Sequence, residues 1–455
     1  MTHAPRIGLV LDHPQRDMTG LLLVALELSR AGASVVILPS YLSWLGAAMT
    51  GVDAVMFNFA RRGNLQAMHW LARQDKDIFV LDTEGYLSAD RHKMLLCALS
   101  ELNVGNLLQG YFVWGEASKA TIAQADPVLG AKIVVSGCPR FDMFAPRWRG
   151  MLTWDRRDYI LINPNFNSVN PLRRDPEAER QTMRAGGWEP SYLDRFLADM
   201  RAGFASFLEL CKALPQRMPH RQFVVRPHPF EWAEPYREAT AGLPNVHVNT
   251  EGEVFPVLAN AARLIHLNCN TSVETRMLGG RPIQAGFLNT ELLRKHLPLY
   301  TGVSVTADSL DELCRMLDDD GYLAAKDDST GIHERWIQPA FGPCDGYAAR
   351  RVAEALLARC RPRGQRGIEG TSPRESTRAK AARLLRVGLG GLLGTAAIAE
   401  LRAWRVPRRR AKQFTAEGIR AALTALATHS GQPAPAVRTL RSPWTAMPMA
   451  AVLIE

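Results

Sequence analysis

An arginine and a histidine follow an apolar run in Arg221-Gln-Phe-Val-Val-Arg-Pro-His-Pro229. Pro227 and Pro229 cannot donate to a sheet ladder, so the predicted strand ends there and Arg226 and His228 leave the sheet at its carboxyl edge. Open α/β sheets bind ligands at that edge. A guanidinium supplies fixed positive charge, and an imidazole can donate to a phosphate oxygen or protonate a leaving group. The pair therefore predicts an anion site, and the alternative is a proline-kinked surface turn.

A second polar cluster follows the strand predicted at 263–268. Asn270, Thr271 and Ser272 open a short predicted helix, whose free N–H groups and dipole favour an anion. If this strand neighbours the first, both clusters converge on one phosphate-sized spot. Glu274 either completes a capping box with Thr271 or binds a ribose, and both interpretations stay open.

Carboxylates and amides follow other predicted strands. Asp82 and Glu84 come after the fourth strand, where either can take a proton from an acceptor hydroxyl, although a helix cap or loop carboxylate is the simpler interpretation. Arg140 follows the sixth strand, and Asn163 and Asn165 lie in an asparagine-rich loop after the seventh. These three side chains are candidates for lining a ligand cleft, although asparagine-rich loops are often simple turns.

Short apolar runs alternate with helical patterns through most of the chain. The alternation predicts two doubly wound, Rossmann-like α/β domains facing a cleft, at 1–150 and 151–343, followed by a closing helix at 344–360. We expect the acceptor in the first domain and a nucleotide donor in the second. No GxGxxG follows the first strand, which disfavours a dinucleotide cofactor.

The net charge of +10 belongs to the end of the chain. Residues 361–455 carry 17 Lys and Arg against 5 Asp and Glu, whereas residues 1–360 carry 38 against 40. The near-neutral body disfavours nucleic acid as a partner. In the stretch 384–410, an apolar run from Leu384 to Leu401 precedes an arginine-rich segment, and Arg386 and Glu400 inside the run disfavour a spanning helix. Two interpretations of this basic, partly helical tail stay open: a helix on the inner leaflet of the membrane, or a disordered appendage.

The cysteines and the first residues of the chain indicate in which cellular compartment the protein is expected. Seven cysteines without CxxC spacing indicate a reducing environment and disfavour structural zinc. No apolar signal-peptide core follows Met1. We therefore expect a cytoplasmic protein, peripheral on the inner face of the membrane if the tail binds lipid. No Asp-x-Asp pair occurs among the cleft candidates, so no metal is predicted.

Several motifs together resemble a family of bacterial surface carbohydrate biosynthesis proteins with the two-domain GT-B glycosyltransferase fold. The matching pieces are Asp82-Thr-Glu-Gly85, Trp114-Gly-Glu116, Gly137-Cys-Pro-Arg-Phe-Asp142, Ile160-Leu-Ile-Asn-Pro-Asn-Phe166, Arg226-Pro-His-Pro229 and Asn270-Thr-Ser-Val-Glu274. They span residues 82–274, and the tail lies outside the resemblance.

The same motifs are distantly similar to those of bacterial sialyltransferases, capsule Kdo transferases and CDP-glycerol glycerophosphotransferases. The resemblance implies that His228, Thr271 and Ser272 bind the phosphate of a cytidine-nucleotide donor, CMP- or CDP-linked, without a further cofactor. It also implies that Glu84 or Asp82 is the catalytic carboxylate. Because Thr83 occupies the first acidic position of the motif, which carboxylate acts stays open.

The expected function is transfer of a sugar from a nucleotide-activated donor to a glycan or lipid-linked acceptor during surface polysaccharide biosynthesis. Three alternatives stay open: a CDP-polyol phosphotransferase, a GT-B nucleotide-sugar epimerase, and a non-catalytic nucleotide-binding scaffold.

Overall fold

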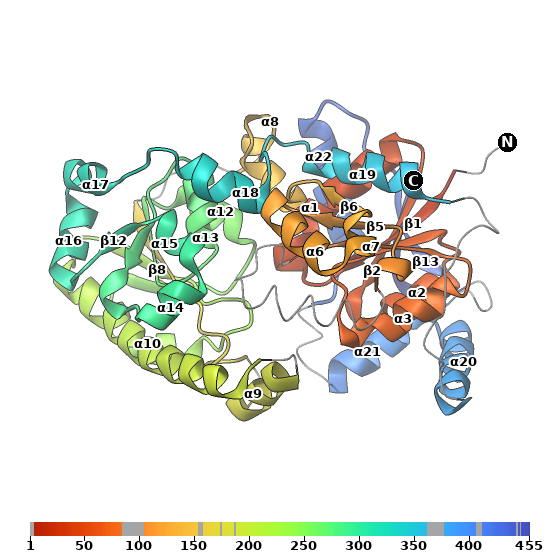
Figure 1. Ribbon diagram of the computed structural model, residues 1–455, viewed down its shortest axis with the longest axis horizontal. Coiled ribbons are helices and arrows are strands. Elements are labelled where there is room, and N and C mark those ends of the chain that lie inside the picture. Colours follow the sequence, from red (N-terminus) through yellow and green to blue (C-terminus); the bar gives the residue numbers. More distant parts are fainter. Residues whose placement is uncertain are drawn as a thin grey trace. The chain divides into compact units, whose positions relative to one another are not determined.

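The chain forms two compact α/β units in the computed structural model (Figure 1). The structure describes residues 4–83, 104–152, 158–172, 175–185, 188–361, 377–405, 412–442, 445 and 447–455. The first unit takes the described residues up to Met151 and those from Ala340 onward, and the second takes Leu152–Pro339. Each unit is built on its own sheet. The predicted fold class, two Rossmann-like α/β domains, is confirmed.

An eight-stranded sheet forms the first unit, in the order β13-β14-β2-β1-β3-β4-β5-β6. The first six strands of the chain pair in parallel, as predicted. All residues of β3 and β4 are buried, which is typical of a parallel sheet covered on both faces. The strands are β1 (Arg6–Leu11), β2 (Ser34–Pro39), β3 (Ala54–Phe57), β4 (Asp77–Leu81), β5 (Gly110–Val113), β6 (Ile133–Val135), β13 (Val437–Arg441) and β14 (Pro448–Ile454).

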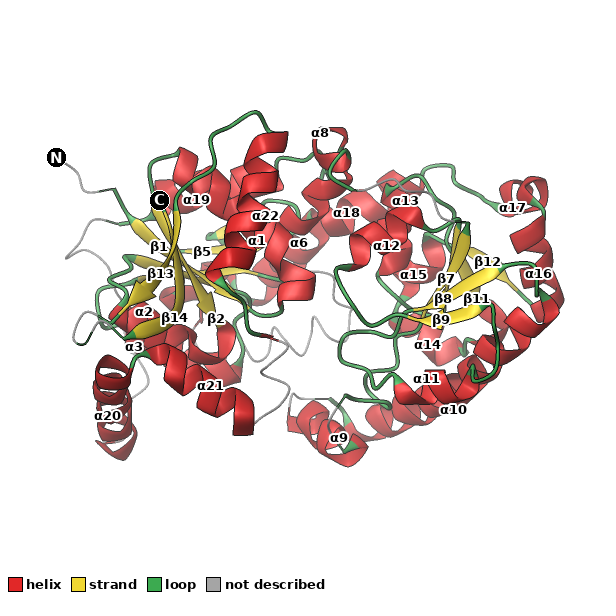
Figure 2. Ribbon diagram, turned by 180° about the vertical axis from the view of Figure 1, so that it is seen from behind, coloured by secondary structure: helices red, strands yellow, loops and turns green. Residues whose placement is uncertain are grey.

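Helices cover both faces of this sheet (Figure 2). One face carries α1, which packs against α19 and α22. The other face takes buried side chains from α2, α3 and α6, among them Ala47, Met68 and Ile122. The helices are α1 (Pro14–Arg30), η1 (Ser40–Leu42), α2 (Ser43–Met49), α3 (Arg62–Ala72), α5 (Val104–Leu107), α6 (Glu116–Ala125), α7 (Pro127–Gly130), η2 (Pro139–Phe144), α8 (Pro146–Arg149), α19 (Ala348–Arg359), α20 (Thr377–Leu393), α21 (Thr395–Arg405) and α22 (Ala416–His429).

The end of the chain is part of the first unit, which corrects the expectation of a tail outside the folded body. β14 pairs antiparallel with β2, and β13 pairs with β14. In α22, the buried residues Ile419, Leu423, Leu426 and Ala427 follow helical spacing toward α1. The Arg-, Gly- and Pro-rich composition after Arg361 obscured these two ordinary signals, an apolar strand and an amphipathic helix.

A six-stranded parallel sheet forms the second unit, in the order β12-β11-β10-β7-β8-β9. The strands are β7 (Tyr159–Asn163), β8 (Gln222–Val225), β9 (Val246–Val248), β10 (Arg263–His266), β11 (Ile283–Ala285) and β12 (Val305–Ala307). The helices are α9 (Pro176–Ala185), α10 (Pro190–Arg217), α11 (Glu234–Ala239), α12 (Val254–Asn260), α13 (Thr271–Met277), η3 (Gly286–Leu288), α14 (Glu291–His296), α15 (Pro298–Gly302), α16 (Leu310–Asp318), α17 (Asp320–Lys326) and η4 (His333–Ile337), with α18 (Gln338–Phe341) where the chain returns to the first unit.

One expectation about this second sheet is not met. The strands before the two polar clusters, β8 and β10, are not neighbours, because β7 lies between them. Neighbouring strands are about 4.8 Å apart, so β8 and β10 are separated by about 10 Å. The clusters therefore flank the loop after β7 instead of meeting at one phosphate-sized spot.

Candidate functional site

The second sheet changes winding direction at β7. From this strand the chain adds β8 and β9 on one side and then β10, β11 and β12 on the other. Ligands of open α/β sheets bind outside the carboxyl ends of the strands at such a switch point. The loops after β7, β8 and β10 open there, and they carry most of the predicted site residues.

His228 lies half-buried in the loop after β8. Its Nδ1 accepts a hydrogen bond of 3.2 Å from the backbone N–H of Phe230. A neutral imidazole has one donor and one acceptor nitrogen, so the proton of this ring is on Nε2. An Nε2–H group can donate to a phosphate oxygen, and the role of His228 as a phosphate ligand stays a prediction.

Glu231 fixes the loop that carries His228, and the sequence analysis missed it. The residue is 4% exposed. Its Oε2 accepts from the backbone N–H of His228 at 2.9 Å, and its Oε1 accepts from the backbone N–H of Phe166 at 2.5 Å. Burial raises the pKa of the Glu231 carboxyl to about 7. One carboxyl group thus joins the loops after β7 and β8. The available signal was an acidic residue three positions after the histidine.

Arg226, which was predicted to contact a phosphate, donates hydrogen bonds within the protein. Its guanidinium donates to Oδ1 of Asn249 at 3.1 Å and to the carbonyl oxygens of Glu251 at 2.7 Å and Gly252 at 2.6 Å. These acceptors belong to the loop after β9. Burial lowers the pKa of this guanidinium below its usual range. Arg226 therefore ties down a neighbouring loop, and the predicted phosphate contact has no support in its hydrogen bonds.

The start of α13 is less open than predicted. Asn270 is the N-cap residue, so Thr271 lies one position too late for a capping box. Ser272 is fully buried, and its hydroxyl donates to the carbonyl of Cys269 at 2.8 Å. The buried carboxylate of Glu274 accepts from Nδ2 of Asn270 at 3.2 Å. The buried hydroxyl of Thr271 lies within hydrogen-bond reach of the Cys269 thiol.

Asn163 ends β7, and Asn165 lies in the loop that follows it. Nδ2 of Asn165 donates to the carbonyl of Asn268, after β10, at 2.8 Å. Asn163 is 3% exposed, and its Oδ1 lacks a partner within the described part of the chain. Its register partner His266 ends β10, four residues before the N-cap of α13. The buried Oδ1 of Asn163 at the end of β7 thus lies on the strand next to the one that leads into α13.

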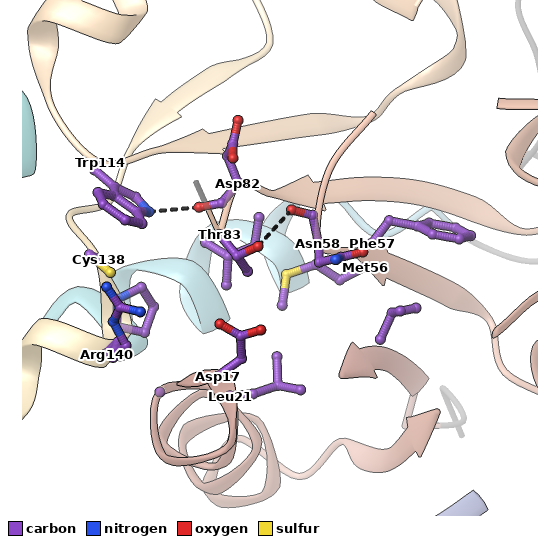
Figure 3. A pocket seen from close by; sticks show the side chains of 14 residues that line it. Asp17, Leu21, Met56, Phe57, Asn58, Asp82, Thr83, Trp114, Cys138 and Arg140 are labelled. Carbon is purple, nitrogen blue, oxygen red and sulfur yellow. Dashed lines mark hydrogen bonds between the residues drawn. The ribbon is translucent and has the colours of Figure 1, made fainter. Parts of the chain in front are cut away.

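The first unit has its own switch point at β1, between β2 and β3. A cavity of about 40 Å³ opens there (Figure 3), at the carboxyl ends of β1, β3 and β4. This volume holds a few waters at most, since one water needs about 10–15 Å³. Its polar lining side chains are Asp17, Asn58, Asp82, Thr83, Trp114 and Arg140.

Of the two carboxylates predicted to act in catalysis, Asp82 and Glu84, the structure describes only Asp82. Asp82 is 7% exposed, and its Oδ2 accepts from the hydroxyl of Tyr111 at 2.8 Å. Burial and the negative charge of Asp82 both raise the pKa of Tyr111. In Figure 3 the Asp82 carboxylate points away from Asp17. Glu84 lies outside the described residues.

Asp17 and Asn58 are cavity residues that the sequence analysis missed. The Asp17 carboxylate accepts from Nε of Arg16 at 2.7 Å and points from α1 into the cavity (Figure 3). Asn58 is 4% exposed, and its Nδ2 has no partner among the residues described. The available signals were a first-turn acid in α1 and a polar residue directly after β3.

Arg140, which was predicted to line a ligand cleft, lines the same cavity in the first unit. The short helix η2 that carries it packs closely on α1: a Cβ at Gly20 would lie only 2.6 Å from the backbone nitrogen of Arg140. The neighbouring Cys138 is buried, which raises the pKa of its thiol to about 12. A thiol with this pKa stays protonated at neutral pH. Among the described residues, no group of three His, Cys, Asp or Glu side chains is placed to hold a metal.

Comparisons with known proteins give no family. No protein-family model matches the chain, and no curated protein matches it by sequence. Among solved structures, the chain is similar to a UDP-GlcNAc 2-epimerase from Neisseria meningitidis bound to UDP-GlcNAc, at 13% identity over 78% of this chain and 100% of that chain, with a TM-score of 0.48.

Two further likenesses are of the same order. A putative UDP-N-acetylglucosamine 2-epimerase from Listeria monocytogenes is 14% identical over 78% of this chain and 97% of its own, with a TM-score of 0.49. A variant of the wall teichoic acid polymerase TagF is 9% identical over 78% of this chain and 88% of its own, with a TM-score of 0.46. The proposal below therefore depends on the chain's own residues.

Proposed function

We propose that the chain is a GT-B-type glycosyltransferase of bacterial surface polysaccharide biosynthesis. It transfers a sugar from a nucleotide-activated donor to a glycan or lipid-linked acceptor. The observation that carries this proposal is His228, whose Nδ1 accepts from the backbone N–H of Phe230, so that the ring carries its proton on Nε2. The ring lies on a loop clamped by a buried carboxyl group, beside the switch point of the second sheet.

The donor nucleotide binds along the carboxyl edge of the second sheet. The Nε2–H of His228 donates to a donor phosphate oxygen, and this bond strengthens as negative charge grows on the leaving phosphate. Across β7, the hydroxyl of Thr271 and the amide of Asn163 meet the rest of the nucleotide, and Glu274 accepts from a ribose hydroxyl. The separation of about 10 Å between β8 and β10 suits an extended nucleotide better than a single phosphate. The resemblance of the motifs favours a cytidine nucleotide.

The acceptor binds to the first unit near the cavity at β1. Asn58 and Arg140 donate to acceptor hydroxyls, and a carboxylate removes the proton of the attacking hydroxyl. Glu84 and Asp82 remain the proposed catalytic carboxylates, and Asp17 joins them because its carboxylate points into the cavity. The reaction takes place in the cytoplasm. The acceptor is a glycan, or a group linked to a lipid at the inner membrane surface.

Nucleotide release from CMP-, CDP-, UDP- and GDP-linked donors tests the proposal. Wild type, His228→Ala and His220→Ala are compared; the control histidine lies in the same unit with a side chain 60% exposed. We expect His228→Ala to lower turnover about 100-fold, as for loss of a transition-state donor, and His220→Ala to leave it unchanged.

Three outcomes contradict the proposal. Isomerisation of a donor without an acceptor identifies an epimerase. Transfer of a polyol phosphate from a CDP-polyol identifies a phosphotransferase. Nucleotide binding with equal, background turnover in all three proteins identifies a scaffold.

A further inference from the structure

Helix α20 is fixed to the first unit along one face. Its Gly390 lies so close to α2 that an added Cβ would be 3.1 Å from Sδ of Met49. The Arg383 guanidinium lies 5.2 Å from the ring centre of Trp44 and 5.6 Å from that of Trp70. Val387 packs in the same cluster. These contacts define the packed face of α20.

The opposite face of α20 is a row of exposed leucines, which we call the leucine face. Its members are Leu384, Leu385, Leu389, Leu392 and Leu393, with exposures of 61%, 65%, 42%, 59% and 52%. At about 100° per residue, they cover about half of the helix circumference, centred opposite the packed face. The other large exposed apolar residues in the described part of the chain are scattered over several elements. A contiguous patch of this kind marks an interaction surface, whereas single exposed leucines do not.

The charge around the leucine face indicates what it contacts. Between Thr377 and Arg405 the chain has six Lys or Arg and a single acidic residue, Glu400. Arg386 is exposed on α20, and helical spacing places it beside Leu393 at the edge of the leucine face. An apolar face with cationic flanks is the pattern of helices that lie in the surface of an anionic membrane.

The end of α20 is tied to the sheet, which favours a helix lying on a membrane. The hydroxyls of Ser442 and Thr445 both donate to the carbonyl of Gly391, at 2.7 and 3.0 Å. Oγ1 of Thr395 accepts from the backbone N–H of Ala450 in β14 at 2.8 Å. Within the described residues, no single helix has the length and apolarity to cross a bilayer. Arg383–Leu393 and Thr395–Leu401 are long and apolar enough only when taken together, and the chain bends by 108° between them.

We propose that the leucine face of α20 docks the protein on anionic lipid. The leucines enter the acyl boundary, and Arg386 contacts a lipid phosphate. The packed face stays on α2, so docking requires no unfolding of the first unit. This inference is independent of the reaction proposed above.

Flotation of the full chain with vesicles tests the docking. We expect binding to vesicles of phosphatidylcholine mixed with phosphatidylglycerol, weakening as salt rises, and little binding to phosphatidylcholine alone. We expect the double variant Leu385→Asp/Leu392→Asp to lower binding by more than about tenfold, because two side chains that would be buried in the lipid become charged. Arg386→Glu lowers it about fivefold.

The matched control is Val128→Asp, which places the same charge at an apolar side chain 49% exposed on α7. We expect this variant to bind like wild type, and thermal unfolding of each variant checks that it is folded. Absence of wild-type binding to anionic vesicles overturns the inference, as does equal binding by the double variant. A wild-type dimer that the double variant converts to a monomer, without vesicle binding by either, identifies a second copy as the occupant of the leucine face instead.

Discussion

The Glu231 carboxyl group accepts a hydrogen bond of 2.9 Å from the backbone N–H of His228. This bond fixes the backbone of the residue that we propose to bind the donor phosphate. The second oxygen bonds Phe166 in the loop after β7. Removing this group leaves two buried N–H donors without an acceptor. We expect Glu231→Ala to lower the free energy of unfolding by about 3 kcal/mol and to weaken nucleotide binding, as thermal unfolding and calorimetry would measure.

The same carboxyl group predicts a pH dependence of stability. Burial raises its pKa from 4.5 to about 7 in the fold, so the folded state binds the extra proton. The resulting stability is complete below pH 4.5 and is lost as the pH rises through about 7, by up to about 3 kcal/mol. Glu231→Gln keeps a neutral side chain at every pH. Denaturant unfolding at several pH values should show wild type losing stability relative to Glu231→Gln as the pH rises; parallel pH profiles would contradict the assignment.

A variant of Arg226 can distinguish a structural role of this side chain from a role in binding the nucleotide. Its guanidinium donates to three oxygens of the loop after β9. We expect Arg226→Ala to cost about 2–3 kcal/mol of stability, because the loop after β9 loses three hydrogen bonds from a charged donor. Nucleotide affinity, measured by calorimetry at a temperature where the variant is folded, should change less than twofold if the guanidinium does not touch the ligand. Arg237→Ala, at a side chain 47% exposed in the same unit, is the control. A large loss of affinity with unchanged stability would restore the original prediction.

The last strand of the chain should contribute to stability as a core strand does. Ile454 is fully buried in β14 and pairs with Val35 of β2. Ile454→Ala is therefore expected to lower the free energy of unfolding by about 2–5 kcal/mol, measured by chemical denaturation. Leu401→Ala, at a side chain 52% exposed, should change it by less than about 0.5 kcal/mol. Equal stability of the two variants would mean that the end of the chain is an appendage after all.

Local signals predicted the elements but not their order in space. Apolar strands alternating with helices identified both sheets, and the prolines beside His228 correctly placed it after a strand. The position of β7 between β8 and β10 depends on which neighbour each strand selects, and no single segment encodes that choice. Asp17 and Asn58 come together only through the pairing of β1 with β3. The hydrogen bonds of Arg226 and Glu231 likewise depend on loops that are distant in sequence.

Asn58 and Asn245 should respond in opposite ways to the same substitution. Nδ2 of Asn58 is buried at the cavity without a partner among the described residues, so its desolvation is a standing cost in the free protein. Asn58→Leu removes that donor at similar volume, and we expect stability to rise by about 1 kcal/mol. Nδ2 of Asn245 instead donates to three carbonyls, of Pro215, Met218 and Arg221.

Asn245→Leu leaves those carbonyls unpaired and should cost about 2–3 kcal/mol, so the pair of variants calibrates the measurement. If Asn58 binds the acceptor, Asn58→Leu also raises the acceptor KM about tenfold, the effect of about 1.4 kcal/mol of lost binding, while donor affinity is unchanged. A protein keeps an unsatisfied donor at some cost in stability where a ligand satisfies it. Destabilisation by Asn58→Leu, or an unchanged acceptor KM, would show that this donor serves the fold of the first unit and not its ligand.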